Sequence, residues 1–133
     1  MPKILLIEDN PDITFIYQDD LEEAGYDVTT ARDGEQGLEV AKQGEFDLIL
    51  LDIMLPGRHG MSVLRELKRE DPTKDVPVYV LSALSDGIVA DQAYNTGADG
   101  FFVKSEYDPG ELATALDKVF SGVKNAAGDE KAE

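Results

Sequence analysis

An unbroken apolar run at residues 48–51 constrains the fold of this chain more than any other segment. Because apolar and polar residues do not alternate in it, the run predicts a strand buried on both faces, as in the middle of a parallel sheet. It ends at an ionisable residue, Asp52, and Pro56-Gly57 follows soon after. Open parallel sheets bind ligands outside the carboxyl ends of their strands, so Asp52 is a candidate for chemistry. Alone, however, an aspartate at a strand end often only caps the next turn.

The rest of the chain alternates short apolar runs with segments of helical periodicity. Strands are expected at Lys3–Ile7, Tyr26–Ala31, 48–51, Val76–Leu81 and Asp99–Val103. Helices are expected from Pro11 to Gly25, from Gly34 to Gly44, after Gly60, from Ser85 to Thr96 and from Pro109 to Gly122. The apolar stripes predicted to face the core are Ile13, Ile16, Tyr17, Leu21 and Ala24 in the first helix and Leu112, Ala115, Leu116, Val119 and Phe120 in the last. Five strands that alternate with five helices predict an α/β fold, a parallel sheet with helices on both faces.

Length and composition indicate one globular domain over residues 1–122, with a flexible polar tail at 123–133. The net charge is −16, from 28 acidic against 12 basic residues, and direct binding to nucleic acid would need a basic surface. The densest basic cluster, at residues 65–70, is interleaved with acids and is interpreted as a solvated helix face. No apolar run reaches the roughly 20 residues of a membrane-spanning helix, and the opening strand meets charged residues too soon for a signal peptide. With no cysteine in the chain, we expect a cytoplasmic location.

Polar side chains stand at the ends of four predicted strands. They are Glu8 and Asp9 after the first strand, Asp52 at the end of the third, Ser82 after the fourth and Lys104 after the fifth. In a doubly wound sheet these ends lie along one edge, with the first and third strands at the topological switch point. The sequence therefore predicts three carboxylates, a hydroxyl and an ammonium around one crevice.

The three carboxylates need a cationic partner. Each pair at about 4 Å repels by about 1 kcal/mol in water and by about 4 kcal/mol at an effective dielectric near 20. Lys104 supplies one positive charge, and a hard divalent ion would supply two more. Oxygen ligands without a nearby histidine or cysteine favour Mg²⁺ or Mn²⁺ over zinc. Such a metal, together with Lys104 and the Ser82 hydroxyl, suits a phosphoryl group, and the central acid, Asp52, is the predicted nucleophile.

These residues carry a family resemblance. The segments 7–11, 50–57, 81–83 and 97–104, together with Gly60, resemble the motifs of the receiver domain of two-component response regulators. They occur in the family's order over residues 2–121, which is nearly the whole folded chain. The resemblance implies a flavodoxin-like, doubly wound (βα)5 fold with sheet order 2-1-3-4-5. It also implies a phosphoacceptor that assists its own phosphorylation and dephosphorylation, and not an enzyme.

The resemblance further assigns a role to each site residue. Asp52 would receive a phosphoryl group from a phosphohistidine on a sensor histidine kinase or a histidine phosphotransfer protein. The assignments for the metal are Asp9, Asp52 and the Met54 backbone carbonyl as direct ligands, with Glu8 acting mostly through water. Those for the phosphoryl group are Ser82, Lys104 and the Ala83 backbone N–H.

The resemblance also predicts a switch. Phe101 falls at the family's switch aromatic, although a plain core aromatic is an equally good interpretation of this residue. Movement of Ser82 and Phe101 would reshape the face formed by the fourth helix, fifth strand and fifth helix, where a downstream protein would bind. A phosphorylation-dependent dimer is a further expected partner state.

The chain departs from the family at one position. Ser105 stands where receivers usually have a proline after the lysine, joined by a cis bond; a trans bond is expected here because a non-proline cis bond costs about 2.5–4 kcal/mol. The sequence does not say whether the chain is a stand-alone receiver or part of a longer regulator or hybrid kinase.

Three other functions were weighed. The first is a receiver-like interaction module that is never phosphorylated, and nothing is missing from the site to favour it. The second is an aspartate-nucleophile phosphatase, which would need an acid where Met54 stands. The third is a flavin carrier, whose phosphate would be repelled by Glu8 and Asp9.

Overall fold

The computed structural model describes residues 1–55, 59–83, 87–104 and 109–121. The strands are β1 (Lys3–Ile7), β2 (Asp27–Ala31), β3 (Leu48–Asp52), β4 (Val78–Ser82) and β5 (Gly100–Val103). The helices are α1 (Pro11–Glu23), α2 (Gly34–Gln43), α3 (Gly60–Arg69), α4 (Gly87–Thr96) and α5 (Pro109–Phe120). The strands form one parallel sheet in the order β2-β1-β3-β4-β5. The doubly wound fold and strand order predicted from the sequence are therefore confirmed.

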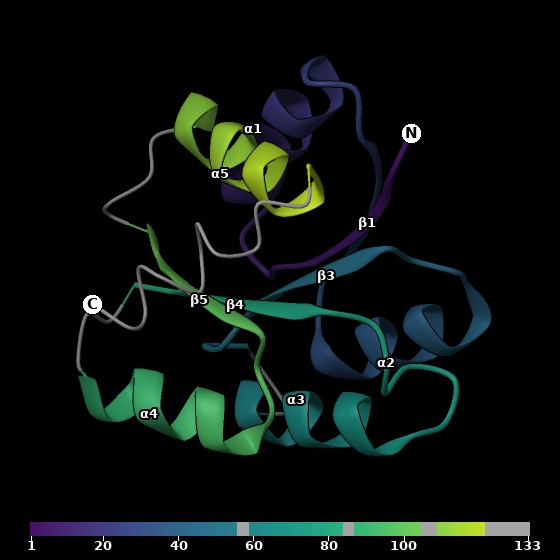
Figure 1. Cartoon of the computed structure of the whole chain (residues 1–133), viewed down its shortest axis with the longest axis vertical. Helices are drawn as coiled ribbons and strands as arrows, with labels where there is room; N and C mark the ends of the chain where they lie inside the picture. The colour runs from purple at the N-terminus through teal and green to yellow at the C-terminus, as the bar shows by residue number, and fades with distance from the viewer. Residues whose placement is uncertain (56–58, 84–86, 105–108, 122–133) are drawn as a thin grey trace.

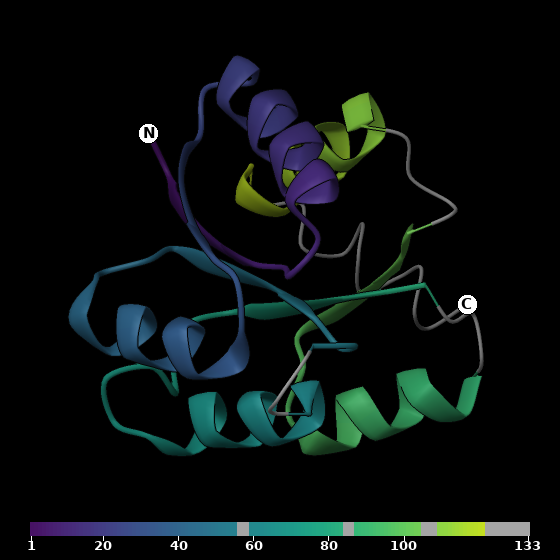
Figure 2. The ribbon, with the colours of Figure 1, turned by 180° about the vertical axis from the view of Figure 1, so that it is seen from behind.

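The sheet lies between two layers of helices. Figures 1 and 2 show α1 and α5 on one face and α2, α3 and α4 on the other. In β3, all five residues are buried. Because successive side chains point to opposite faces, Ile49 and Leu51 join the core under α2 and α3, whereas Leu48 and Leu50 join the core under α1 and α5. The predicted burial of this strand on both faces is confirmed.

The strand register brings the predicted site residues to one level. Ile7 of β1 is paired with Leu51 of β3, so the residues that follow each of them are neighbours at the same edge. Across the sheet, Asp52 is paired with Leu81 and Ser82 with Val103, the residue before Lys104. The strand ends thus step along one edge of the sheet, as the sequence predicts.

Helix α1 begins as predicted but packs differently from its predicted stripe. The Asn10 side chain accepts hydrogen bonds from the Asp12 and Ile13 N–H groups, at 2.9 and 3.3 Å, and caps the helix. The prediction was wrong for Ile16, which is 44% exposed, and for Ala24, which is exposed and follows the helix. A helical step of about 100° per residue explains this, because burying Tyr17 and Leu21 turns Ile16 toward the side of the helix.

The basic cluster on α3 is only partly solvated, contrary to the prediction. The Lys68 Nζ donates hydrogen bonds to the Val76 carbonyl at 3.0 Å and to Asp99 Oδ2 at 3.1 Å. Asp99 Oδ2 also accepts the Val78 N–H at 2.8 Å. These side chains bind backbone groups at the entry to β4 and β5, which begin at Val78 and Gly100, one or two residues later than predicted. The hydrogen bonds of Lys68 therefore link α3 to the residues that precede β4 and β5.

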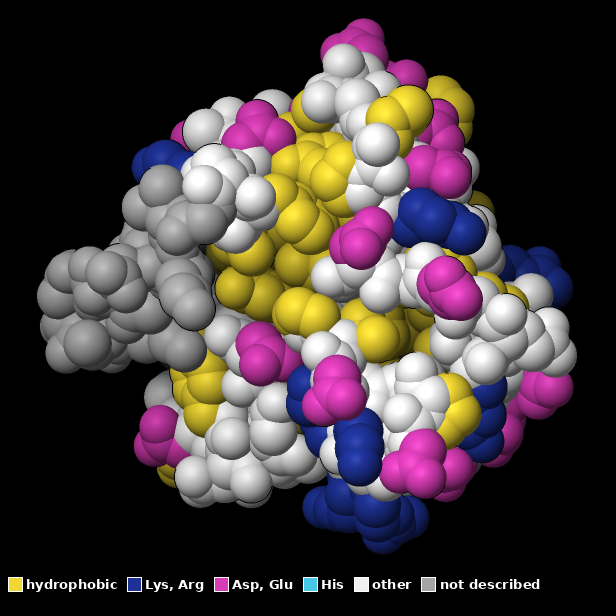
Figure 3. Space-filling view, turned by 45° about the vertical axis from the view of Figure 1, so that its right-hand side comes forward, with side chains coloured by type: hydrophobic (Ala, Val, Ile, Leu, Met, Phe, Trp, Pro, Cys, Tyr) yellow, Lys and Arg dark blue, Asp and Glu magenta, His cyan; other side chains and the backbone are white. Residues whose placement is uncertain are grey.

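The predicted site residues all lie away from the opposite edge of the sheet, where the amino ends of the strands are found. When the N-terminal end of β1 is turned toward the viewer, hydrophobic side chains gather in the middle of the surface, with acidic and basic groups around them (Figure 3). Among the described residues, no helix has the length and apolar character needed to cross a membrane. The predicted tail and Ser105, with its peptide bond, lie outside the described residues.

Candidate functional site at the carboxyl ends of the strands

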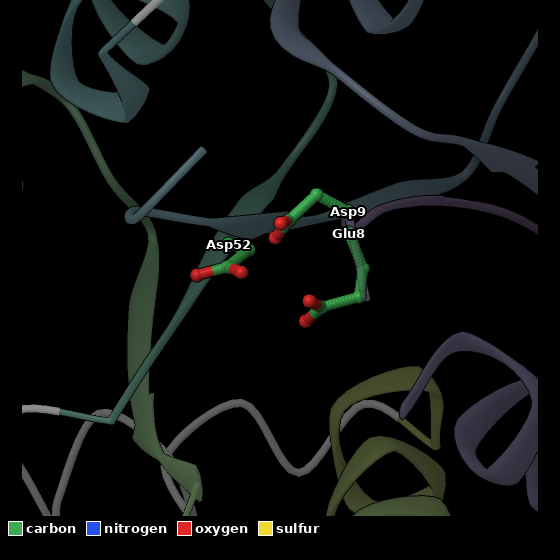
Figure 4. Close-up of side chains that lie close together, drawn as sticks. All are labelled: Glu8, Asp9 and Asp52. Carbon is green, nitrogen blue, oxygen red and sulfur yellow. The ribbon is translucent and has the colours of Figure 1, made fainter. Parts of the chain in front are cut away.

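Three carboxylates meet at the end of β1 and β3. One oxygen from each of Glu8, Asp9 and Asp52 lies within 4.8 Å of the others. Figure 4 shows the Asp9 carboxylate pointing toward Asp52, with the Glu8 carboxylate below both. Glu8 and Asp52 are buried, with exposed fractions of 1% and 2%, whereas Asp9 is exposed. The cluster is therefore a buried pair of acids with one acid at its mouth.

Lys104 bridges the two buried acids from the end of β5. Its Nζ lies 2.8 Å from Glu8 Oε1 and 3.2 Å from Asp52 Oδ2, and its side chain is mostly covered. These residues are separated by 96 and 52 positions in the sequence, so the contact depends wholly on the sheet register. The ammonium holds both carboxylates in place and offsets part of their repulsion.

Backbone N–H groups fix the remaining oxygens of the same two acids. The Asn10 N–H donates to Glu8 Oε2 at 3.1 Å, and the Met54 N–H donates to Asp52 Oδ1 at 3.0 Å. At the start of α3, the Gly60 N–H donates to the carbonyl of Ile53, the residue between Asp52 and Met54, at 3.2 Å. Each buried carboxylate thus has one oxygen bound to the lysine and the other bound to the backbone.

Burial and charge shift the pKa values of groups in the site. Burial is the main cause that raises the pKa of the Glu8 carboxyl, and the charge of Asp52 adds to it, against the lowering effect of Lys104. For Lys104, burial alone would lower the pKa, but the hydrogen bond to Glu8 and the charge of Asp52 outweigh it and raise the pKa. The lysine therefore remains charged throughout the neutral pH range.

The other predicted site residues lie in or directly after strands β3, β4 and β5. Ser82 is fully buried at the end of β4, and Ala83 follows it on the surface. The Met54 side chain is 58% exposed beside Asp52. Phe101 is partly buried and packs against the core under α2 and α3, which suits a core aromatic and a switch residue alike.

Tyr17 is a neighbour of the site that sequence reasoning missed. It was predicted to face the core, and it does, at 6% exposure. Burial raises the pKa of its phenol, and the nearby charges of Lys104, Glu8 and Asp52 act on it as well. Its spacing on the helix indicated burial, but only the way α1 crosses the sheet brings its ring within range of these charges.

The residues present fit a hard divalent cation. When the three acids are ionised, Lys104 balances only one of their charges, which leaves two negative charges. The donors are carboxylate oxygens, and one of the acids, Asp9, is open to solvent. This is the donor set that Mg²⁺ and Mn²⁺ prefer, and it lacks the imidazole and thiolate ligands typical of zinc.

Comparison with known proteins decides the family. Residues 4–117 match the family model described as the response regulator receiver domain. The chain is a receiver domain. This domain is 44% identical over 106 residues to the DNA-binding dual master transcriptional regulator RpaA from Synechocystis, covering 78% of this chain and 43% of RpaA. The receiver spans about half or less of the length of the curated relatives it matches.

Solved structures of response regulators have the same fold as this chain. The chemotaxis response regulator CheY4 of Vibrio cholerae superimposes with a TM-score of 0.83 at 28% identity, covering 90% of this receiver and 98% of CheY4. The phosphorylated cyanobacterial phytochrome response regulator RcpA gives a TM-score of 0.80 at 26% identity, covering 92% and 95% of the two chains.

The family fixes the general function of this chain. It is a phosphoacceptor module of two-component signalling and not a catalytic enzyme. Receiver domains bind a divalent metal and are phosphorylated by histidine kinases. The acidic cluster of Glu8, Asp9 and Asp52 is consistent with the phosphorylation site.

Proposed function

We propose that Asp52 is the residue that accepts the phosphoryl group. The observation that carries this assignment is its position in the cluster: Asp52 is bound to Lys104 and lies within 4.8 Å of Glu8 and Asp9. Asp52 ends β3, the middle strand of the sheet, so it stands between the two acids that follow β1 and the Ser82 hydroxyl at the end of β4. Asp52 is therefore the acid best placed to act as the nucleophile.

In the reaction, a carboxylate oxygen of Asp52 attacks the phosphorus of a phosphohistidine. An O–P bond forms, the P–N bond breaks, and its electron pair returns to the imidazole nitrogen of the donor. The product is an acyl phosphate on Asp52. Most of the catalytic contribution in such a transfer is positioning and charge stabilisation, which fixed groups such as Lys104 can provide.

Mg²⁺, or Mn²⁺ in its place, would be held by the Asp9 and Asp52 carboxylates and by the Met54 backbone carbonyl, with Glu8 acting through water. The bound metal supplies positive charge that offsets the negative charge of the transferring phosphoryl group. The hydrogen bond from the Met54 N–H to Asp52 supports this assignment, because it fixes the turn that carries the Met54 carbonyl.

Once phosphorylated, Asp52 would offer new acceptor oxygens to Lys104, the Ser82 hydroxyl and the Ala83 N–H. Movement of Ser82 would then be passed to Phe101, which packs partly buried in the neighbouring strand. The face formed by α4, β5 and α5 would change shape and bind a downstream protein, or a second copy of this chain as a dimer. The donor is a sensor histidine kinase or a histidine phosphotransfer protein, and the expected location is the cytoplasm.

Labelling with acetyl phosphate tests this assignment. We expect incorporation of one phosphoryl group that requires Mg²⁺ and disappears in Asp52→Asn. The matched control is Asp27→Asn, which removes an exposed acid at the other end of the sheet and should label normally. Labelling of Asp52→Asn at the wild-type level would refute the assignment, and absence of labelling in the wild type would favour an unphosphorylated interaction module.

A further inference from the structure

The buried charges of the site all lie on one side of the sheet. Leu6 of β1 points into the core under α1 and α5, and so does Leu50 of β3. Glu8 and Asp52 follow these two leucines by two residues, so their side chains point to the same side of the sheet. Figure 4 shows the Glu8 carboxylate pointing to the side where α5, in yellow-green, lies. The Lys104 Nζ contacts both acids on this side.

Helix α1 covers these charges and directs Tyr17 toward them. The Thr14 hydroxyl donates a hydrogen bond to the Glu8 carbonyl at 3.3 Å. Because residues three apart share one face of a helix, Tyr17 also faces the end of β1. Helical side chains lean toward the N-terminus of their helix, and α1 begins at Asn10, whose N–H binds Glu8 Oε2. The Tyr17 side chain therefore leans from the core toward the buried charges.

The phenol of Tyr17 is a buried polar group among charges. Its ring belongs to the core under α1 and α5 and is 6% exposed. Burial raises the pKa of the phenol, the charge of Lys104 lowers it, and the charges of Glu8 and Asp52 raise it again. The hydroxyl is therefore neutral at neutral pH, and its charged neighbours are groups of the phosphoacceptor site. A buried tyrosine hydroxyl usually has a hydrogen-bond partner, and these groups are the ones at hand.

Phosphorylation changes what Lys104 can bind. In the structure its Nζ donates to Glu8 Oε1 and to Asp52 Oδ2. In an acyl phosphate, one oxygen of Asp52 carries the phosphorus and the other is a carbonyl, so neither keeps the charge that strengthens a bond to an ammonium. Lys104 must therefore turn from Asp52 to the phosphoryl oxygens. An ammonium has three N–H groups, so it can hold Glu8, a phosphoryl oxygen and one further acceptor together.

We propose that Tyr17 is a positioning residue for phosphoryl transfer, whose phenol oxygen accepts the third N–H of Lys104 as the ammonium turns to the phosphoryl group. Glu8 at the end of β1 and Tyr17 on α1 would then hold the lysine from two elements. A neutral acceptor suits this place, because another carboxylate would repel the incoming phosphoryl group. The proposal rests on the function proposed above and adds a residue that acts through Lys104.

Initial rates of labelling by acetyl phosphate test this role. Tyr17→Phe removes the hydroxyl and keeps the ring that packs in the core. It should lower kcat/KM for labelling by about tenfold, as expected when one hydrogen bond to a charged group is lost. Phosphate-affinity electrophoresis separates the labelled from the unlabelled chain and gives the rate.

A double-mutant cycle with Lys104→Met separates positioning from a structural role. If the hydroxyl acts through the ammonium, Tyr17→Phe should change the slow labelling rate of Lys104→Met by less than about twofold. Nuclear magnetic resonance of the beryllofluoride complex, which stands in for the acyl phosphate, gives a second measurement. The ammonium protons of Lys104 should exchange with water faster in Tyr17→Phe than in the wild type.

Tyr79→Phe is the matched control. Tyr79 is also 6% exposed in the core under α1 and α5, but the charge that acts on its phenol is that of Asp99, at the entry to β5. This variant should label within about twofold of the wild type, because it lies away from the site. Equal slowing of Tyr79→Phe and Tyr17→Phe would overturn the proposal, since any buried hydroxyl would then have the same effect.

The remaining outcomes are distinct. Labelling of Tyr17→Phe at the wild-type rate would overturn the positioning role and leave the proposed function intact. An equal loss of rate in the wild-type and Lys104→Met backgrounds, with unchanged exchange of the ammonium protons, would also overturn it, because the hydroxyl would then act independently of the lysine. Failure of acetyl phosphate to label the wild-type chain would overturn the proposed function itself.

Discussion

A methyl group added at Gly60 tests how tightly the turn after β3 is built. The Cβ of an alanine at this position would clash with the Ile53 carbonyl oxygen and would lie 2.5 Å from the Ile53 Cα, well inside van der Waals contact. Both are backbone atoms of a buried residue, so neither can rotate away as a flexible side chain would. The Gly60 N–H also donates to the same carbonyl, at 3.2 Å. The turn must therefore shift to admit the methyl group.

The expected cost follows from these contacts. Overpacking a well-packed site costs about 1–3 kcal/mol, and the upper half of that range applies here because backbone must move. We therefore expect the free energy of unfolding of Gly60→Ala to fall by about 2–3 kcal/mol in urea titrations followed by circular dichroism. A shift of Ile53 also displaces Met54, whose N–H holds Asp52 Oδ1. Mg²⁺ affinity, measured by calorimetry, should fall by about tenfold or more.

Gly110→Ala is the matched control for this experiment. Gly110 also lies near a helix start, but an added Cβ would meet no atom within 4 Å. Because alanine restricts the unfolded chain more than glycine does, this variant should be neutral or more stable by about 0.4–1 kcal/mol. If Gly60→Ala proves as stable as Gly110→Ala and binds Mg²⁺ like the wild type, the close approach of Gly60 to Ile53 has no energetic importance and the reasoning fails.

Two further predictions concern stability. Burial, and then the hydrogen bond to Asp117 at 2.5 Å with its charge, raise the pKa of Tyr26, so the folded state keeps the phenol proton that the unfolded state loses above pH of about 10. The free energy of unfolding should therefore fall as pH rises above about 10, by up to about 1.4 kcal/mol per pH unit for this group. Urea titrations between pH 8 and 11 should show a shallower fall for Tyr26→Phe than for the wild type. The same dependence of the unfolding free energy on pH in both proteins would contradict this prediction. Asp99→Ala should lower the free energy of unfolding by about 1 kcal/mol, because it leaves the Val78 N–H and Lys68 without this acceptor on a partly exposed side chain. Asp99→Asn keeps an acceptor and should lose less, so equal losses for the two variants would show that the hydrogen bond contributes nothing.

The local sequence predicted which residues stand at the strand ends. The apolar run before Asp52 could only be satisfied by a strand buried on both faces, and the alternation of strands and helices left a parallel sheet as the solution. In such a sheet the carboxyl ends share one edge, so Glu8, Asp52 and Lys104 had to be neighbours. The resemblance to receiver domains then gave the order of the strands, and the structure confirmed it.

Only the tertiary structure could show the contacts that depend on how one helix or strand packs across another. Helical spacing could not distinguish Ile16, at the side of α1, from Tyr17 beneath it, because the two differ only in the rotation of the helix on the sheet. Nor could charge patterning show that Lys68 binds the entry to β4, since Asp99, its partner, lies 31 residues away.

The same division holds at the site. The sequence by itself determined its chemistry, three acids and a lysine at adjoining strand ends. Only the tertiary structure decided that Lys104 bridges Glu8 and Asp52 at 2.8 and 3.2 Å and that Asp9 stays open to solvent. The physical reason is that a strand's periodicity sets where its side chains point, whereas the distances between side chains on different strands are set by the register and packing of the whole sheet.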